Sequence, residues 1–255
     1  MTQSQLDFDA RLSFTKYNER FKVEKPYAFK IPLEGTDIPS SNIDHSGTGI
    51  FHVTDIRGIE SSFSLAKNGF AILPFRDDLS YEDYHDETKV QKYFREVEEL
   101  LKEHLEAKEV KVFRHAIRKR DAAWPERYAG EVYKFDQPTT VAHIGNFWKP
   151  LRGPLNDWPL IYYDSSTVNR DRDLEPADLI YPDRVAENTC IYHSPDYKWY
   201  FLSSQKTSEI IVFMQGDTLV NAPPGVPHCS VPNPHTPVGE PPRQSIEVRC
   251  LVFYD

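Results

Sequence analysis

The chain has 255 residues, of which 39% are hydrophobic and 13% aromatic, and it carries a formal net charge of −9 at pH 7. This length allows one domain with a large core, and the acidic balance argues against nucleic acid as a partner, because phosphate contacts need a basic face. The chain contains no apolar run long enough to predict a membrane span, and its polar, acidic first ten residues lack the apolar core of a secretion signal. The widely spaced Cys190, Cys229 and Cys250 form no zinc pattern and are expected to stay reduced in a cytoplasmic protein.

The N-terminal part of the chain predicts an arm followed by a few strands. Residues 1–48 are polar with scattered aromatic residues, so we expect an arm that packs on the body through its rings and has little structure of its own. Residues 49–56 and 70–75 are expected to form strands. A short helix at 61–67 is expected between them, because the following Asn68-Gly69 pair favours a left-handed helix end.

Residues 86–107 predict a long amphipathic helix. Their apolar side chains recur at intervals of three and four residues, which produces a single stripe, whereas the other face is charged. The stripe consists of Val90, Tyr93, Phe94, Val97, Leu100, Leu101 and Leu105. We expect this helix to lie against the outside of a β-barrel and to support it, with its charged face in solvent.

The rest of the chain predicts strands at regular spacing. They are expected at residues 110–117, 146–151, 158–163, 209–214, 226–231 and 245–254, and residues 189–193 and 198–203 are expected to form a hairpin around a Ser-Pro-Asp turn. A helical N-terminal part followed by about eight strands is typical of a jelly roll or a double-stranded β-helix barrel. The predicted fold class is therefore mainly β with flanking helices.

We expect residues 1–255 to form one domain, because no repeat or linker divides them. Its parts would be the arm (1–48), the first strands with the supporting helix (49–109) and the β-helix barrel (110–255). Sheet edges and the arm leave a homodimer open, but no sequence feature demands one.

The C-terminal segment carries a pattern that indicates a bound carboxylate. His228 is followed fifteen positions later by Arg243-x-Ser245, and both parts lie on alternating apolar segments. In a double-stranded β-helix, such a pattern closes an iron and 2-oxoglutarate site, with the histidine as the last metal ligand. The guanidinium of Arg243 and the hydroxyl of Ser245 would then hold a carboxylate by charge-assisted hydrogen bonds.

Several phrases of the sequence occur together in a known order. They are Asn146-Phe147-Trp148-Lys149-Pro150-Leu151-Arg152-Gly153-Pro154, Asp157-Trp158-Pro159-Leu160, Lys198-Trp199-Tyr200, Pro227-His228 and Arg243-Gln244-Ser245-Ile246-Glu247-Val248-Arg249. With them, the chain resembles the fungal hydroxylase/desaturase family of the asaB type over roughly residues 50–255. This family is related to gibberellin desaturases and to the cephalosporin methoxylation protein CmcJ. The resemblance implies a 2-oxoglutarate oxygenase-like barrel and a role in fungal secondary metabolism.

One stretch departs from the pattern of the family that the chain resembles. Active members carry a His-x-Asp pair, then a loop of some twenty residues, and only then the Asn-x-Trp-x-Pro strand. Here His143 matches the histidine, Gly145 stands in the place of the aspartate, and the chain runs straight into Asn146. Non-haem iron(II) needs two histidines and one carboxylate on one face. We therefore expect a pocket that has lost its metal and needs no cofactor.

The expected cavity has aromatic and cationic walls. We expect His228, Arg243, Lys149 and Arg249 to be catalytic, and Trp148, Arg152, Tyr192, Trp199, Tyr200, Ser245 and Glu247 to bind substrate. On β-strand alternation, Glu247 and Arg249 share a face with Ser245 and would neutralise each other if they point inward; otherwise that face is exposed or the strand is bulged.

Such a cavity suits a small, apolar, oxygenated substrate with an enolised or tropolone-like oxygen. Cationic donors would polarise that oxygen, and aromatic walls would hold an apolar reaction partner in register. By analogy with the fungal enzymes that join tropolones to humulene-type sesquiterpenes, our hypothesis is a cofactor-independent dehydration to a quinone methide, followed by a hetero-Diels–Alder addition.

Two alternatives stay open at this point. In the first, the chain is an Fe(II)/2-oxoglutarate-dependent hydroxylase or desaturase. His143 and His228 would then bind iron, Arg243 and Ser245 would bind the co-substrate, and water or a carboxylate such as Asp136 would supply the third ligand. In the second, the chain is a non-catalytic binding protein that keeps only the fold.

Overall fold

The computed structural model describes residues 6–77, 79–120, 126–129, 143–217 and 225–254. The chain forms two compact units. The first, called unit 1, comprises Met1–Phe8, Val53–Ser166 and Trp199–Asp255, and the second, unit 2, comprises Asp9–His52 and Thr167–Lys198. None of the helices in these described ranges combines the length and the hydropathy that a membrane crossing requires.

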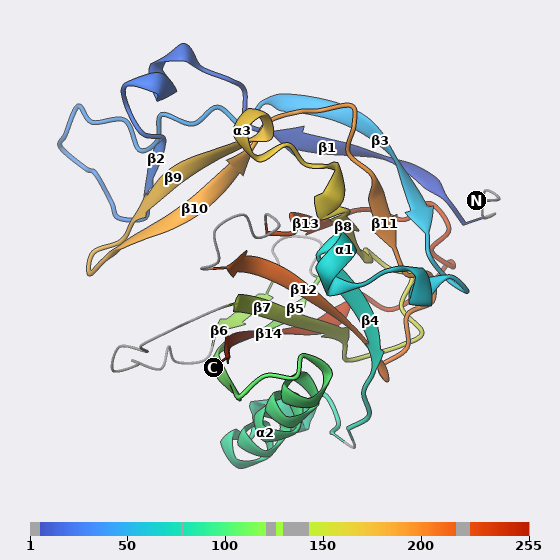
Figure 1. The fold of residues 1–255 in the computed structure, drawn as a ribbon. Helices are drawn as coiled ribbons and strands as arrows, with labels where there is room; N and C mark the ends of the chain where they lie inside the picture. The colour runs from blue at the N-terminus through green and yellow to red at the C-terminus, as the bar shows by residue number, and fades with distance from the viewer. Residues whose placement is uncertain (1–5, 78, 121–125, 130–142, 218–224, 255) are drawn as a thin grey trace. The chain divides into compact units, whose positions relative to one another are not determined.

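Unit 1 contains a six-stranded sheet (Figure 1). Its order is β4 (Phe70–Pro74), β12 (Glu209–Asp217), β7 (His143–Pro150), β14 (Gln244–Phe253), β5 (Glu109–Lys119) and β6 (Glu126–Ala129), and every neighbouring pair runs antiparallel. The five strands expected in these segments are confirmed, whereas β6 was not expected. The pairing of β14 with β5 shifts register after Arg249, so the chain contains a bulge there.

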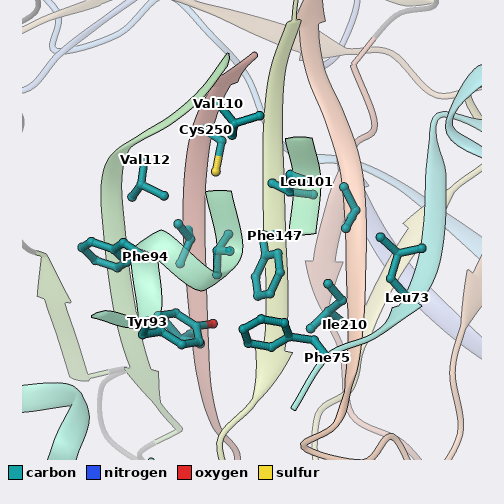
Figure 2. Close-up of a cluster of buried hydrophobic side chains, with 14 of the residues drawn as sticks. Leu73, Phe75, Tyr93, Phe94, Leu101, Val110, Val112, Phe147, Ile210 and Cys250 are labelled. Atoms are coloured by element: carbon teal, nitrogen blue, oxygen red, sulfur yellow. The ribbon is translucent and has the colours of Figure 1, made fainter. Parts of the chain in front are cut away.

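The long helix α2 (Glu87–His104) covers one face of this sheet, as Figure 1 shows. Its apolar stripe is buried as expected, and Asp86 caps its first turn by accepting a hydrogen bond from the backbone N–H of Lys89. Figure 2 shows Tyr93, Phe94 and Leu101 of the helix beside Phe147 and Cys250 of the strands. The helix and the sheet thus share one core. The side chains of the strands that belong to this core must point toward α2.

Leu101 should be among the residues that hold α2 on the sheet. Its side chain is 1% exposed, so Leu101→Ala would leave a cavity and is expected to lower the free energy of unfolding by about 2–5 kcal/mol. Urea denaturation measures this change. The exposed neighbour Lys102→Ala is the control and should change the free energy by less than about 0.5 kcal/mol; equal effects of the two substitutions would contradict the packing.

Unit 1 also contains part of a second sheet. There β11 (Trp199–Phe201) pairs in parallel with Val53–Asp55 of β3 (Gly47–Asp55) and antiparallel with β8 (Leu160–Tyr163), which in turn pairs with β13 (His228–Ser230). Side chains from both sheets of unit 1 meet in a second buried cluster, which includes Trp148, Ile211, Phe213, Tyr162 and Tyr200. The six-stranded sheet therefore has two buried faces, one toward α2 and one toward this cluster. The latter is called the inner face below.

Short helices complete unit 1. They are α1 (Leu65–Asn68), which ends at Gly69 with a left-handed φ of 79°, and the 3-10 turns Glu60–Ser62 and Glu82–His85, while a further turn, Ser165–Thr167, lies at its boundary. The expected helix end at Asn68-Gly69 is confirmed. The expected helix at 61–67 is shorter, because a 3-10 turn and an extended residue, Phe63, precede α1.

Unit 2 has more regular structure than the expected arm. It contains most of β1 (Phe8–Phe14) beside the first part of β3, and a three-stranded sheet of β10 (Val185–Ile191), β9 (Leu174–Ile180) and β2 (Tyr27–Phe29), together with α3 (Arg170–Asp173) and the 3-10 turn Glu19–Lys22. In β1, buried and exposed residues alternate strictly, which is the pattern of a strand with one buried face.

The expected hairpin around the Ser-Pro-Asp turn is wrong. Its first strand belongs to β10, which pairs with β9, and its second strand is β11, which pairs with β3 and β8. The segment of β9 was not recognised as a strand, because its Pro176 and its acidic residues are uncommon in strands. Without β9, the sequence offered β10 no partner other than its successor.

Candidate active site

The inner face of β14 carries a row of polar side chains. Ser245, Glu247 and Arg249 alternate with Ile246 and Val248, which belong to the core under α2. The row is continued on both sides of β14, because Arg249 pairs with Asn146, Glu247 with Trp148, and Ser245 with Arg118. The sequence left open whether this face is exposed; the structure places it inside unit 1.

Glu247 is the centre of a buried ion-pair cluster. Its side chain is 4% exposed, forms an ion pair with Arg118 Nη2 at 2.9 Å, and accepts hydrogen bonds from Arg249 Nε at 3.1 Å and from Asn146 Nδ2 at 3.4 Å. Burial alone would raise the pKa of this carboxyl, but the guanidinium groups of Arg118 and Arg249 outweigh it and hold the pKa below its usual value. Glu247 is therefore a carboxylate that two arginines share.

His228 lies on β13, close enough to this cluster to interact with the charges of Glu247, Arg118 and Arg249. Its Nδ1 lies 2.9 Å from the carbonyl oxygen of Val226, which can only accept, so Nδ1 carries the proton. Burial lowers the pKa of the imidazole, which favours its neutral form. Nε2 is then the nitrogen with a free lone pair, and it could bind a metal or accept a proton.

Arg243 presents buried donors just before β14. Its Nη1 donates to the carbonyl of Trp158 at 3.1 Å and to Ser230 Oγ, and its backbone N–H donates to Asp157 at 2.8 Å. Burial and the neighbouring Arg118 lower the pKa of Arg243 to about 10, so the group stays charged at neutral pH. Among the described residues, its Nε and the hydroxyl of Ser245 have no hydrogen-bond partner, although both are buried. Such groups call for a ligand.

The aromatic residues expected to bind substrate are only partly brought together. Trp148 and Tyr200 lie in the cluster between the sheets of unit 1, near the site. Trp199 precedes Tyr200 on β11 and therefore points to the other face, where its ring packs edge-on against Tyr163 with centroids 5.4 Å apart. The expectation that Trp148 and Trp199 line one cavity thus differs from the structure.

Lys149 lies on the opposite face of the sheet from the site. It follows the inward Trp148, so its side chain points toward α2, where it pairs with Asp77 and lies 5.7 Å from the ring centroid of Tyr93. The prediction that Lys149 is catalytic at the cavity is therefore wrong. Both faces of β7 are buried, so the sequence pattern alone does not show which face Lys149 occupies.

Arg152 and Tyr192 also lie away from the inner face. Arg152 is exposed after the end of β7 and lines a cavity of about 440 Å³ together with residues 153–156 and 237–243, so that Arg243 borders the same cavity. Tyr192 belongs to unit 2, where its hydroxyl donates to Glu175 at 3.0 Å. Neither residue is brought to Glu247 and His228 by a described contact.

The position that replaces the expected aspartate faces α2. Gly145 pairs with Cys250, whose side chain belongs to the core under the helix, so alternation places position 145 on that side of β7, opposite Asn146. The backbone of His143 pairs with Val252. Asp136 lies outside the described residues. Within the described ranges, no group of three His, Cys, Asp or Glu side chains could hold a metal.

This register makes a prediction for Gly145→Asp. Within the described part of the chain, no atom lies within 4 Å of the place where a Cβ would stand, so the side chain can be accommodated. Because it would point to the α2 side, we expect the variant to bind Fe(II) no more tightly than the parent protein, as measured by anaerobic titration. A gain of about tenfold or more, which corresponds to about 1.4 kcal/mol, would show that position 145 faces His228.

The sequence reasoning missed Arg118 and overlooked Asn146 as a site residue. The strand expected at 110–117 ended one residue before Arg118; extending it would have placed Arg118 in phase with Ala116 on the inner face. Tyr162 was missed as well. It pairs with His228 across β8 and β13, and its buried hydroxyl has no partner among the described residues. A histidine on the neighbouring strand was the only signal that could have found it.

Comparison with known proteins identifies relatives over the whole chain. Residues 12–145 and 140–253 match a family model described as "Oxidoreductase/YMDC permease-like domain". The iron and alpha-ketoglutarate-dependent endoperoxidase NvfI has a solved structure that covers 98% of this chain and 99% of its own, with a TM-score of 0.77 and 25% identity. This likeness confirms the predicted double-stranded β-helix fold of the 2-oxoglutarate oxygenase type.

Three curated fungal proteins are similar in sequence. Aspirochlorine biosynthesis protein N of Aspergillus oryzae is 40% identical over 118 residues, 45% of this chain and 49% of that protein. The Fe(II)/2-oxoglutarate-dependent dioxygenase nvfI of Aspergillus novofumigatus is 40% identical over 108 residues, 42% of this chain and 38% of that protein. These alignments span half or less of each relative. The hydroxylase/desaturase poxK of Penicillium oxalicum is 26% identical over 86% of this chain and 83% of its own length.

These relatives overturn the expectation that the protein works without a cofactor. That expectation depended on the missing carboxylate at position 145 and on the missing loop before Asn146, whereas the proteins that match by sequence and by fold include enzymes named for their dependence on iron and 2-oxoglutarate. The findings therefore point to iron and 2-oxoglutarate. With its match to the family model over both halves, the chain belongs to the family described as "Oxidoreductase/YMDC permease-like domain", and its relatives include fungal biosynthesis proteins and Fe(II)/2-oxoglutarate-dependent oxygenases.

Proposed function

We propose that this protein is an Fe(II)/2-oxoglutarate-dependent hydroxylase or desaturase that oxidises a small natural product. One observation carries the proposal: Arg243 Nε and Ser245 Oγ are buried donors without a partner in the described part of the chain. They belong to the Arg-x-Ser pattern and stand on the same inner face as Glu247, with which His228 interacts. A carboxylate of 2-oxoglutarate would satisfy both donors.

The described residues fit the co-substrate better than they fit the metal. A planar guanidinium and a hydroxyl match a carboxylate in charge and in hydrogen-bonding capacity. For the metal, His228 fits as one ligand, since its Nδ1 proton is fixed on the carbonyl of Val226 and Nε2 is left for coordination. The other protein ligands would have to come from side chains outside the described ones, and His143 is the candidate that the sequence offers.

Iron with 2-oxoglutarate would supply oxidation by dioxygen: one O₂ and one 2-oxoglutarate are consumed, succinate and CO₂ are released, and the second oxygen atom ends in the new hydroxyl group or, when a double bond forms, in water. The chain's own residues would prepare this reaction. Arg243 and Ser245 orient the co-substrate, and Trp148 and Phe213 provide apolar walls that exclude water. Arg118 and Arg249 keep Glu247 ionised and in place.

The proposal is tested with protein purified without chelator and loaded with Fe(II) under argon. Expected are one iron per chain, saturable binding of 2-oxoglutarate, and slow release of succinate after exposure to air. His228→Ala should lose iron and succinate release, whereas the exposed His104→Ala on α2 is the matched control and should lose neither. Protein that retains no iron and binds no 2-oxoglutarate under these conditions would refute the proposal.

The same experiment bears on the hetero-Diels–Alder hypothesis. That hypothesis assumed a cavity without metal, and the relatives named above favour oxidation instead. A tropolone or a sesquiterpene as substrate has no support among the contacts of the described residues, and neither is part of the proposal.

A further inference from the structure

Around Glu247, the inner face of the six-stranded sheet carries more positive charge than this carboxylate balances. Arg114, Arg118 and Arg249 stand around Glu247, in a protein whose net charge is −9. Strand alternation places Arg114 on this face, because its neighbour His115 packs against Phe94 of α2 with ring centroids 5.0 Å apart. The excess is therefore local and does not follow from the composition of the chain.

Arg114 and Arg249 stand directly opposite each other on β5 and β14. Like charges in directly opposite positions destabilise a sheet. Arg249 is compensated by Glu247, whereas no carboxylate pairs with Arg114 in the described part of the chain. The fold thus keeps two guanidinium groups side by side with one shared carboxylate nearby, which is an arrangement that an additional anion would relieve.

The donors of this cluster are not exhausted by Glu247. A guanidinium has five N–H groups, and Arg249 donates to Glu247 through Nε alone. The side chain of Arg249 is 35% exposed and that of Arg118 is 36% exposed, so both reach open space beside the buried carboxylate. Arg118 Nε has no partner among the described residues. An anionic oxygen therefore finds free charged donors here.

Asn146 adds a second recognition element. It is fully buried, and its Nδ2 lies 3.4 Å from a carboxylate oxygen of Glu247, which can only accept. The orientation of the amide is thereby fixed, and its Oδ1 is left without a partner in the described ranges. A buried acceptor beside free cationic donors suits a ligand that has an O–H or N–H group next to its anionic oxygen.

This anion position differs from the one at Arg243. Arg249 lies six positions after Arg243, which is about 20 Å along an extended strand. Arg243 and Arg249 therefore start from well-separated points of the chain and address different stretches of the inner face. His228 interacts with Glu247 and Arg249, so the anion at the pair would lie close to the imidazole.

We propose that Arg114 and Arg249 form an anion clamp for the substrate, which is a small apolar molecule with a carboxylate or an ionised enol. Asn146 accepts a hydrogen bond from a hydroxyl or N–H next to that group, and the apolar part of the molecule packs against Trp148 and Phe213. This inference rests on the proposed function, because it names the substrate class of the same site.

The test compares two probes that differ only in charge. The first is 1-anilinonaphthalene-8-sulfonate, an apolar anion with an N–H beside its sulfonate, and the second is N-phenyl-1-naphthylamine, which lacks the sulfonate. Both change their fluorescence on binding. In the intact full-length protein, Arg249→Met and Arg114→Met are each expected to weaken binding of the anion about tenfold, the loss of one charge-assisted contact. Binding of the neutral probe should stay within about twofold, since methionine keeps the apolar stem.

Two further variants separate the clamp from general effects of charge and folding. Arg95→Met removes one positive charge from the exposed face of α2 and should leave both probes unaffected. Arg249→Lys keeps the charge and should recover most of the anion binding. Urea denaturation verifies that each variant is folded. Equal losses for both probes, or equal losses in Arg95→Met, would overturn the clamp.

Binding of 2-oxoglutarate to the same variants distinguishes this inference from the proposed function. We expect the clamp variants to keep it and Arg243→Met to lose it. If Arg249→Met loses 2-oxoglutarate but retains the anionic probe, the clamp belongs to the co-substrate and the inference is wrong. If the parent protein binds no 2-oxoglutarate while the difference between the probes persists, the proposed function fails and the clamp stands.

Discussion

Arg243→Met should strongly weaken binding of 2-oxoglutarate while the barrel stays folded. The guanidinium is buried, and its Nε is the unpartnered cationic donor of the Arg-x-Ser pattern. Removing one partner of a buried charge pair typically costs about 2–5 kcal/mol, so the dissociation constant of 2-oxoglutarate should rise by about 30-fold to several thousand-fold. Anaerobic calorimetric titration of the Fe(II)-loaded protein measures this change.

Two comparisons make the result specific. Arg243→Lys keeps a positive charge but loses the planar pair of donors, so it should recover only part of the affinity. Arg95→Met removes an exposed arginine from α2 and should have no effect. Because Arg243 also donates to Trp158 and Ser230, a loss of stability is expected as well, and urea denaturation separates it from the binding defect. Unchanged affinity in Arg243→Met would place the co-substrate elsewhere.

The spacing of apolar residues predicts those helices and strands that have one buried face and one face in solvent. Helix α2 was found because its stripe faces the sheet and its other side faces water, and β1 would have been found for the same reason had the strict alternation of residues 8–14 been read. Pairing across long separations in sequence was not predictable. Nothing near β10 or β11 indicates that one joins β9 and the other joins β3 and β8.

The candidate site was predictable in its chemistry but not in its geometry. Ser245, Glu247 and Arg249 were recognised as a possible inward row, yet the sequence could not decide between an exposed face and a buried one, because the opposite row of β14 is buried too. In the structure, Ile246 and Val248 pack under α2, so Ser245, Glu247 and Arg249 must lie on the opposite, inner face. Both faces of the neighbouring strands are buried as well. For this reason Lys149 was predicted on the wrong face of β7, and Arg118 on β5 was not recognised as a site residue.

The cofactor prediction was wrong because it relied on the stretch from His143 to Asn146 and disregarded the rest of the site. A glycine in place of a metal ligand removes one contact, whereas the Arg-x-Ser donors and the His228 tautomer are independent features that persist. The register of β7 adds that position 145 faces α2. A residue that does not face the site says nothing about what the site binds.

Lys149→Met should be among the most destabilising substitutions in the chain. Lys149 and Asp77 are each 3% exposed and form an ion pair under α2, where the ammonium also lies 5.6 Å from the ring centroid of Phe75. Burial lowers the pKa of Lys149 in spite of the attraction of Asp77, so the environment itself disfavours the charge. Removing the lysine alone leaves a buried carboxylate without its counter-charge, and the free energy of unfolding should fall by about 3–5 kcal/mol.

The double variant Lys149→Met with Asp77→Asn distinguishes loss of the ion pair from loss of packing. Desolvation offsets much of the attraction in a buried pair, so replacing both charges is often close to neutral. Asparagine can still accept the hydrogen bond that Tyr84 donates to Asp77. The double variant should therefore recover most of the loss in urea denaturation, and Lys92→Met, which breaks an exposed pair with Glu96, should change stability by less than about 1 kcal/mol. If the double variant is as unstable as Lys149→Met, the lysine acts through its aliphatic stem and its contacts with the aromatic rings, and the charge of Asp77 is not the cause.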